Sequence, residues 1–156
     1  MSARPARSTA RQPPQRWEIL RCEGGLEGPP GAIADLLRLV NTIAGLRGAR
    51  HDPITLHQRN VAGRLVRSPA VERGAGGCQQ PLAPPASGTP LPDVLVVPGW
   101  QARNGPHLNR LVKRDQPACS RLRAVHAAGG HVVGLFNGVA LLGQAGLLDE
   151  VPAVVP

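Results

Sequence analysis

The sequence predicts a single α/β domain in which helices cover a parallel sheet. Two apolar runs, at 93–97 and 131–136, have the length and the Val and Leu content of strands that are buried on both faces. Helical patterns lie between and around these runs, and this alternation is typical of parallel strands joined by crossover helices. A chain of 156 residues that is 42% hydrophobic is sufficient for one such domain.

The first half of the chain supplies two strands, a helix and a turn with a third, short strand. In chain order we expect a strand at 17–22, a Gly/Pro loop at 23–31, an amphipathic helix at 32–44, a strand at 53–57, a turn with a short strand at 61–66 and a loop at 71–92. The helix carries apolar residues at intervals of three or four that predict one buried face: Ile33, Leu36, Leu37, Val40 and Ile43.

The second half repeats the alternation. After the strand at 93–97 we expect a loop at 100–107, a helix that begins at 108–113, a helix at 117–128, the strand at 131–136 and a helix at 139–148. Pro117 suits the first turn of its helix, where no backbone N–H is needed.

The sharp turn between the last strand and the last helix is the most informative feature. A residue at such a corner has a strained backbone, and its side chain projects above the carboxyl edge of the sheet, where α/β proteins bind ligands. We place Asn137 at this corner, followed by Gly138. A simple tight turn, in which Asn and Gly are common, is an equally good interpretation of the spacing alone.

The chain carries a net charge of +8, and part of it lies in the first segment. Residues 1–16 contain Arg4, Arg7, Arg11 and Arg16 but no acidic residue and no apolar periodicity. This composition predicts a disordered tail and excludes a secretory signal, which needs an apolar core. A transit peptide is a less favoured interpretation of this segment. The other arginines are scattered and no aromatic residues interleave with them, so a solvated basic surface is favoured over a nucleic-acid site.

The cysteines and the lack of long apolar runs limit the protein class. Cys22, Cys78 and Cys119 are far apart and lack metal-ligand spacing, which suits a reducing cytoplasm better than a disulfide framework. No apolar run approaches the ~18–20 residues that span a bilayer. We therefore expect a cytoplasmic protein with no membrane partner, no metal and no cofactor.

Two segments, 92–100 and 130–149, resemble the ThiJ/PfpI family of the class I glutamine amidotransferase-like superfamily. More narrowly, they resemble the amino-terminal domain of GlxA-type AraC-family transcriptional regulators. In those domains a D-x-L-V-V-P-G-G strand precedes a V-x-x-x-C-x-G-A-x-x-L-A-x-A-G-L-L-D-G elbow and helix. Residues 34–45 resemble the family's first helix. The resemblance covers about residues 17 to 150 and implies a three-layer, flavodoxin-like parallel sheet.

The resemblance also implies that something is missing after Asp149. Domains of this family continue with further strands, and the regulators then add a helix-turn-helix domain. We therefore expect a truncated ThiJ/PfpI-like domain at 17–156, incomplete at its C-terminus, with no helix-turn-helix domain. Contact with DNA would need that missing domain. Loss of the last strands would leave an unpaired sheet edge, which a homodimer could cover.

The chain departs from the family's enzymes at the positions that carry catalysis. Those enzymes have a cysteine at the elbow, activated by a nearby carboxylate or histidine. With Asn137 at the elbow in place of the Cys, no thiolate is available to form a covalent intermediate. Glu23 and Glu27 lie in the first loop, but the aligned acid position falls near Pro29, and no histidine follows the elbow.

The remaining nucleophiles and bases fit structural roles better. Cys119 lies far from the elbow in sequence, at a helix start, where a buried structural thiol is expected. His126 and His131 precede the elbow, and we expect surface or packing positions for both.

These observations favour a non-catalytic ligand-sensing or dimerisation domain of a GlxA/AraC-type transcriptional regulator. We expect no catalytic residue, and we expect an unidentified small molecule to bind at Gly99, Trp100, Asn137 and Gly138 through backbone N–H groups and the amide. The alternative is a hydrolase, amidase or glyoxalase-like enzyme of the ThiJ/PfpI type that uses Cys119 or a histidine. A fragment without independent function is a third possibility.

Overall fold

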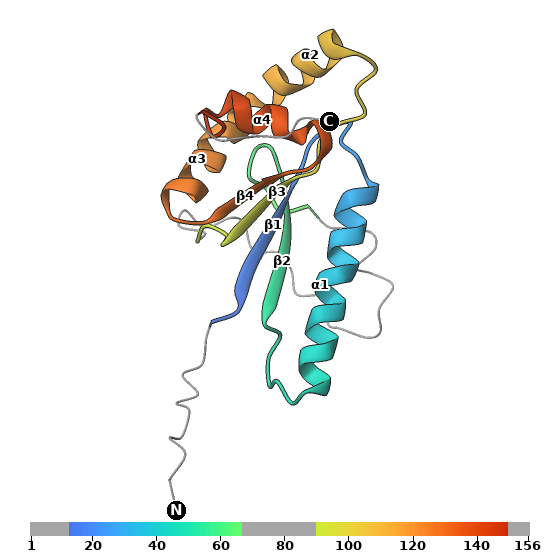
Figure 1. The fold of residues 1–156 in the computed structure, drawn as a ribbon, viewed down its shortest axis with the longest axis vertical. Helices are drawn as coiled ribbons and strands as arrows, with labels where there is room; N and C mark the ends of the chain where they lie inside the picture. The colour runs from blue at the N-terminus through green and yellow to red at the C-terminus, as the bar shows by residue number, and fades with distance from the viewer. Residues whose placement is uncertain (1–12, 67–89, 150–156) are drawn as a thin grey trace, which may run out of the picture.

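The computed structural model describes residues 13–66 and 90–149, and its core is a four-stranded parallel sheet (Figure 1). The strands are β1 (Gln15–Arg21), β2 (Ile54–Asn60), β3 (Val94–Val97) and β4 (His131–Gly134). They lie in the order β2–β1–β3–β4, which is the order of a flavodoxin-like doubly wound sheet. The α/β class predicted from the sequence is confirmed.

Helices cover the two faces of this sheet unequally. They are α1 (Gly28–Leu46), α2 (Gly105–Asp115), α3 (Cys119–Ala127) and α4 (Val139–Gln144), with short 3-10 turns η2 (Gln116–Ala118) and η3 (Phe136–Gly138). Figure 1 shows α1 alone on one side of the strands, whereas α2, α3 and α4 gather on the other. We call the side of α1 the open face and the side of α2–α4 the sealed face.

The sealed face holds the larger part of the core. Side chains alternate along a strand, so every second residue of β1 and β3 points to this face. These strand residues and the inner residues of α3 and α4 are each no more than 2% exposed: Leu20, Leu95, Val97, Leu122, Val125 and Leu141. Because α3 contacts β3, β4 and α4, and α4 also contacts β4, this cluster is continuous.

A buried ion triad lies on the sealed face beside that core. Glu18 of β1, only 3% exposed, accepts hydrogen bonds from Arg59 of β2 at 3.0 Å and from Arg121 of α3 at 2.6 Å. Arg59 also donates to the carbonyl oxygen of Gly63 at 2.8 Å. The triad therefore ties two strands and a helix together, and its single carboxylate serves two guanidinium groups.

The open face is covered less completely. Ile19, Val94 and Val96 form a small buried cluster there, and Ile33 of α1 packs against it. The amide of Asn41 joins α1 to β2, since it donates to the carbonyl oxygen of Ile54 at 2.8 Å and accepts from its N–H at 3.1 Å.

The predicted buried face of α1 is wrong for three of its five residues. The helix residues that are buried are Pro30, Ala34 and Leu37, and Ile33 is half-buried. In contrast, Leu36, Val40 and Ile43 are 62%, 44% and 39% exposed. The helix has apolar residues on more than one side, so periodicity alone could not identify the side that contacts the sheet.

Several boundaries also differ from the predictions. β1 begins at Gln15 instead of 17, and α1 begins at Gly28 instead of 32, because its prolines lie in the first turn, where a missing N–H costs nothing. β4 ends at Gly134, and α4 ends at Gln144 before Gly146 adopts a positive φ of 70°. The predictions for residues 1–12, 67–89 and 150–156 lie outside the described residues.

Candidate functional site

The four residues predicted to bind a ligand lie together at the carboxyl ends of β3 and β4. Gly99 and Trp100 follow β3, and Asn137 and Gly138 follow β4, its neighbour in the sheet. The Asn137 amide bridges the two loops: its oxygen accepts the Trp100 N–H at 2.8 Å, and its nitrogen donates to the Trp100 carbonyl oxygen at 3.0 Å. The proximity inferred from the sequence is therefore present in the structure.

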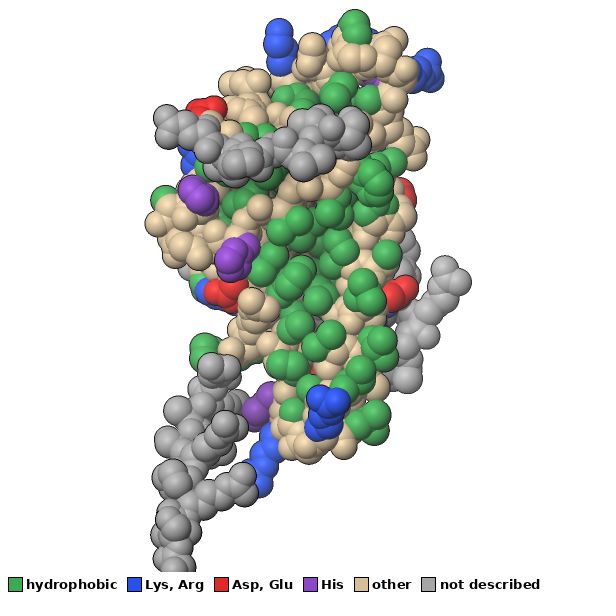
Figure 2. Space-filling view, viewed as in Figure 1, with side chains coloured by type: hydrophobic (Ala, Val, Ile, Leu, Met, Phe, Trp, Pro, Cys, Tyr) green, Lys and Arg blue, Asp and Glu red, His purple; other side chains and the backbone are tan. Residues whose placement is uncertain are grey.

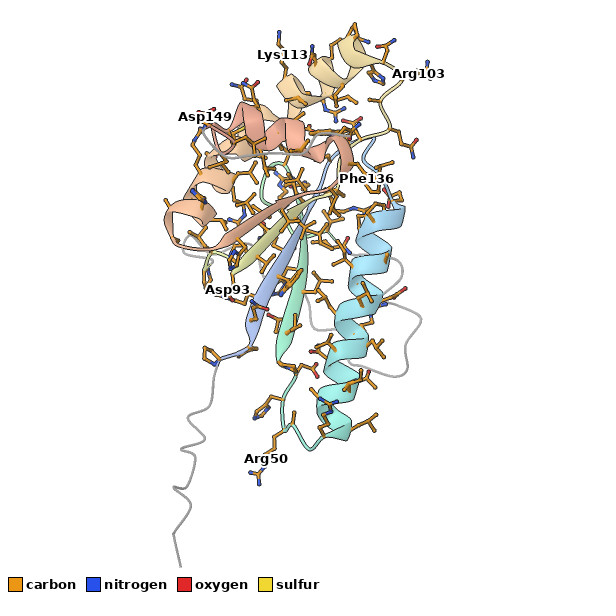
Figure 3. The ribbon with its side chains drawn as sticks, viewed as in Figure 1. Arg50, Asp93, Arg103, Lys113, Phe136 and Asp149 are labelled. Atoms are coloured by element: carbon orange, nitrogen blue, oxygen red, sulfur yellow. The ribbon has the colours of Figure 1, made fainter. Side chains whose placement is uncertain are left out.

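The prediction that Asn137 is the strained corner residue is wrong by one position. Phe136 has a φ of 51° and, within 13–66 and 90–149, no other residue except glycines has a positive φ. This conformation costs a bulky L-residue roughly 1–2 kcal/mol. The family pattern places one residue between its cysteine and the glycine, so counting back from Gly138 also gives Phe136. In the pattern that the sequence resembles, the cysteine position therefore corresponds to Phe136, whose side chain is 63% exposed (Figure 3).

Two of the backbone N–H groups expected to hold a ligand, those of Trp100 and Gly138, already have protein partners. The Trp100 N–H donates to Asn137, and the Gly138 N–H donates to the carbonyl oxygen of Leu135 at 2.8 Å. Both functional atoms of the Asn137 amide are likewise used by Trp100. The elbow is therefore satisfied internally, and a ligand there would have to displace these bonds.

The two glycines let these loops approach so closely that no free space remains between them. Gly99 has a φ of 86°, and a Cβ added to Gly138 would lie 2.5 Å from the carbonyl oxygen of Val97 and 2.9 Å from the Gly99 nitrogen. The sequence signal of glycines at an elbow is correct here, but it reflects close packing of backbone against backbone.

The crevice between β1 and β3, where sheets of this order bind ligands, is also closed. The Leu26 N–H donates to the Gly99 carbonyl oxygen at 3.1 Å, and the Gln101 N–H donates to the Gly24 carbonyl oxygen at 3.0 Å. The Trp100 side chain, 1% exposed, lies in the core.

A polar cluster that the sequence analysis missed lies beside Trp100. The indole N–H donates to Asp115 at 2.7 Å, and Arg114 donates to the same carboxylate at 3.0 Å.

Burial, followed by the proximity of Asp115, raises the pKa of the Cys22 thiol to about 12. Burial also raises the pKa of Cys119. Both thiols are therefore protonated near neutral pH and are poor nucleophiles.

Of the residues considered for catalysis, the acids form ion pairs and the histidines are exposed. Glu23 pairs with Arg114 at 3.6 Å, and Glu27 pairs with Arg21. His126 and His131 are exposed, so of the two predicted positions, surface or packing, they take the surface one. Pro29, near the aligned acid position, lies in the first turn of α1.

Within 13–66 and 90–149, no three His, Cys, Asp or Glu residues are grouped in a way that could hold a metal ion. Among the helices described, none combines the length and apolar character needed to cross a bilayer.

Comparison with known proteins supports the fold. No family model matches the chain, and no curated protein matches it. Among solved structures, a putative transcriptional regulator protein from Vibrio parahaemolyticus is similar with a TM-score of 0.60 and 20% identity, over 92% of this chain and 67% of that one. An AraC family transcriptional regulator from Pseudomonas putida matches with a TM-score of 0.45 and 20% identity, over 90% of this chain and 76% of that one.

Proposed function

We propose that the chain is a non-catalytic domain of a transcriptional regulator that associates with a second copy of itself through α1. The regulator role rests on the sequence resemblance and on the kind of protein that shares the fold. The absence of catalysis is supported by the elbow, which carries Phe136 where a nucleophile would lie and where the N–H groups of Trp100 and Gly138 are already bonded. Small-molecule binding at Gly99, Trp100, Asn137 and Gly138 remains a prediction, and their mutual contacts favour a structural role.

The observation that carries the proposal is an apolar stripe on the outer side of α1. Its large side chains are between 39% and 84% exposed: Leu36, Leu39, Val40, Ile43 and Leu46. Figure 2 shows hydrophobic side chains gathered along α1 and the adjoining part of the open face. Phe136 and Val133 are also exposed, at 63% and 37%. Apolar surfaces of this kind mark interaction sites.

The spacing and charge of the stripe favour a second copy as the partner. Leu36, Leu39, Ile43 and Leu46 follow intervals of 3, 4 and 3, which is the spacing of helices that pack together along a coiled-coil-like seam. A twofold contact uses the same patch on both subunits, and an apolar stripe is complementary to itself. The flanking Asp35 and Arg38 pair with each other at 2.7 Å, so this pair adds no net charge beside the stripe.

The shape of the surface beside the stripe supports the same partner. A hollow of about 580 Å³ at the end of α1 is lined by Val40, Ile43, Ala44, Arg47, Gly48 and Ala49. A helix of 19 residues is about 28 Å long at 1.5 Å per residue, which provides a seam of several turns.

Sedimentation equilibrium of the full chain tests the proposal. We expect a dimer at micromolar concentrations, a monomer for Leu39→Glu and a dimer for the control Gln101→Glu, which adds the same charge at an exposed site away from α1. Circular dichroism checks that both variants stay folded, as expected since Leu39 is 54% exposed. A monomeric parent chain at about 100 μM, or a folded Leu39→Glu variant that still dimerises, would contradict self-association through α1.

The enzymatic alternative has its own test. A covalent adduct formed with an electrophile at neutral pH and mapped to Cys22, Cys119 or a histidine would count against a non-catalytic domain. DNA contact is not proposed for the described residues, and the cytoplasmic location stays a prediction.

A further inference from the structure

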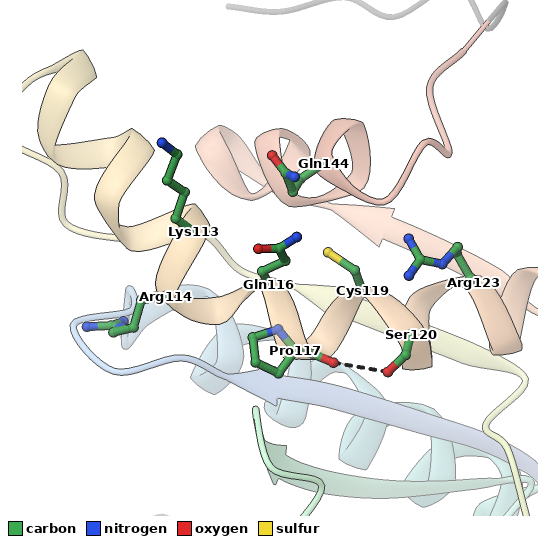
Figure 4. Close-up of a pocket in the computed structure, with 8 residues that line it drawn as sticks. All are labelled: Lys113, Arg114, Gln116, Pro117, Cys119, Ser120, Arg123 and Gln144. Atoms are coloured by element: carbon green, nitrogen blue, oxygen red, sulfur yellow. Dashed lines mark hydrogen bonds between the residues drawn. The ribbon is translucent and has the colours of Figure 1, made fainter.

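A second cavity, separate from both the elbow and the apolar stripe, lies where η2 and α3 meet α4. It has a volume of about 490 Å³, and its lining residues are Lys113, Arg114, Gln116, Pro117, Cys119, Ser120, Arg123 and Gln144. This volume is within the ~300–1,000 Å³ of small-molecule sites. Figure 4 shows Gln116 and Cys119 between the two helical layers, with Gln144 above them and Arg123 at the opposite end from Lys113.

The charge of this cavity has one sign. Its lining contains three cationic side chains and no carboxylate. Arg114 is neutralised by Asp115 at 3.0 Å and by Glu23 at 3.6 Å, and its side chain points away from the middle of the cavity (Figure 4). Lys113 and Arg123, in contrast, form no salt bridge with any residue of the described part of the chain. Two cations thus lie at one cavity without a counter-charge from the described residues.

The neutral polar groups of the lining also have hydrogen-bonding capacity to spare. The side-chain amides of Gln116 and Gln144 make no hydrogen bond to another described residue, and both side chains are exposed. Arg123 makes one long bond, from Nη1 to the Ala145 carbonyl oxygen at 3.5 Å, which leaves its other N–H groups free for an oxyanion. The Ser120 hydroxyl donates to Pro117 at 3.0 Å and points its proton elsewhere.

We propose that this cavity binds a small multivalent oxyanion, a phosphoryl or dicarboxylate group of a small molecule, between Lys113 and Arg123, with the amides of Gln116 and Gln144 as further donors. An oxyanion accepts hydrogen bonds from guanidinium, ammonium and amide N–H groups alike. The competing explanation is that Lys113 and Arg123 only offset the negative C-terminal ends of α2 and α4. The proposal does not depend on self-association, because neither cation lies on α1.

NMR titration of the full chain with inorganic phosphate and, separately, with citrate tests the proposal at constant ionic strength. We expect saturable shifts of the Gln116 and Gln144 side-chain amide resonances with a Kd below about 1 mM. A lower Kd for phosphate indicates a phosphoryl ligand, and a lower Kd for citrate indicates a carboxylate ligand. The double variant Lys113→Gln/Arg123→Gln should raise the Kd at least tenfold.

The matched control is Arg50→Gln/Arg64→Gln, which removes the same charge at exposed positions outside the cavity and should leave the Kd unchanged. Shifts that do not saturate, or an equal loss of affinity in both double variants, would overturn the proposal in favour of general screening or simple helix-end neutralisation. The proposal would also be overturned if phosphate and citrate caused no saturable shift while a short DNA duplex bound equally well to both double variants.

Discussion

The sealed and open faces of the same sheet differ in what covers them. Three helices and a buried ion triad cover the sealed face, where six core residues are each no more than 2% exposed: Leu20, Leu95, Val97, Leu122, Val125 and Leu141. One helix covers the open face, where the buried cluster consists of Ile19, Val94 and Val96. The same helix exposes Leu36 at 62% and Leu46 at 84%.

This difference separates residues that stabilise the fold from residues available to a partner. Parallel sheets normally have both faces covered, because their strands are apolar on both sides. The sealed face meets this requirement within the described chain, whereas the open face leaves apolar surface uncovered. Substitutions on the sealed face should therefore lower the free energy of unfolding, and substitutions on the outer side of α1 should change association instead.

The largest effect is expected from the ion triad of the sealed face. Glu18→Gln removes the carboxylate and leaves Arg59, whose side chain is 7% exposed, without a counter-charge. Loss of one partner from a buried ion pair costs about 3–5 kcal/mol. Urea denaturation at pH 7 should show this loss in the free energy of unfolding.

Glu23→Gln is the matched control for this prediction. Glu23 also faces an arginine, at 3.6 Å, but its side chain is 86% exposed. An exposed pair contributes roughly 0–1 kcal/mol, so this variant should remain close to the parent chain. Equal losses in the two variants would remove the distinction between the buried triad and a surface pair.

A pair of leucine truncations compares the two faces directly. Leu122 is fully buried on the sealed face. Leu122→Ala should lower the free energy of unfolding by about 2–5 kcal/mol. Leu39→Ala on α1, at 54% exposure, should cost less than about 0.5 kcal/mol in the monomer. Urea denaturation at several protein concentrations measures the loss of unfolding free energy in each variant. If Leu39 lies in a dimer interface, the loss caused by Leu39→Ala should grow with protein concentration.

Much of this contrast could not be predicted from the sequence. The alternation of apolar runs and helical patterns correctly predicted the α/β sheet, and the runs at 93–97 and 131–136 correctly located β3 and β4. The helix at 32–44 was also correct, but its apolar residues surround more than half of its circumference. Which of them contact the sheet depends on how α1 is rotated against β1 and β2, and that rotation is a tertiary property.

The candidate site was predictable in position but not in role. The glycines and the strand ends correctly indicated that Gly99, Trp100, Asn137 and Gly138 lie together. Whether Phe136 or Asn137 takes the strained conformation depends on where β4 ends, and strand ends are among the least certain features of a sequence pattern. The triad of Glu18, Arg59 and Arg121 joins residues up to 103 positions apart, and no local pattern signals it.

An effect smaller than those of Glu18→Gln and Leu122→Ala is expected at the elbow, at the carboxyl ends of β3 and β4. Asn137→Ala would leave the N–H and the carbonyl oxygen of Trp100 without their partners, now at 2.8 Å and 3.0 Å. Unpaired groups of this kind cost about 1–3 kcal/mol. Asn41→Ala is the matched comparison, because Asn41 makes the same two-bond bridge to Ile54 on the open face. Both variants should lose stability, but only Asn137→Ala should shift the Trp100 indole resonance, which reports its bond to Asp115. An Asn137→Ala chain of unchanged stability that loses affinity for a small molecule would instead restore the elbow as a binding site.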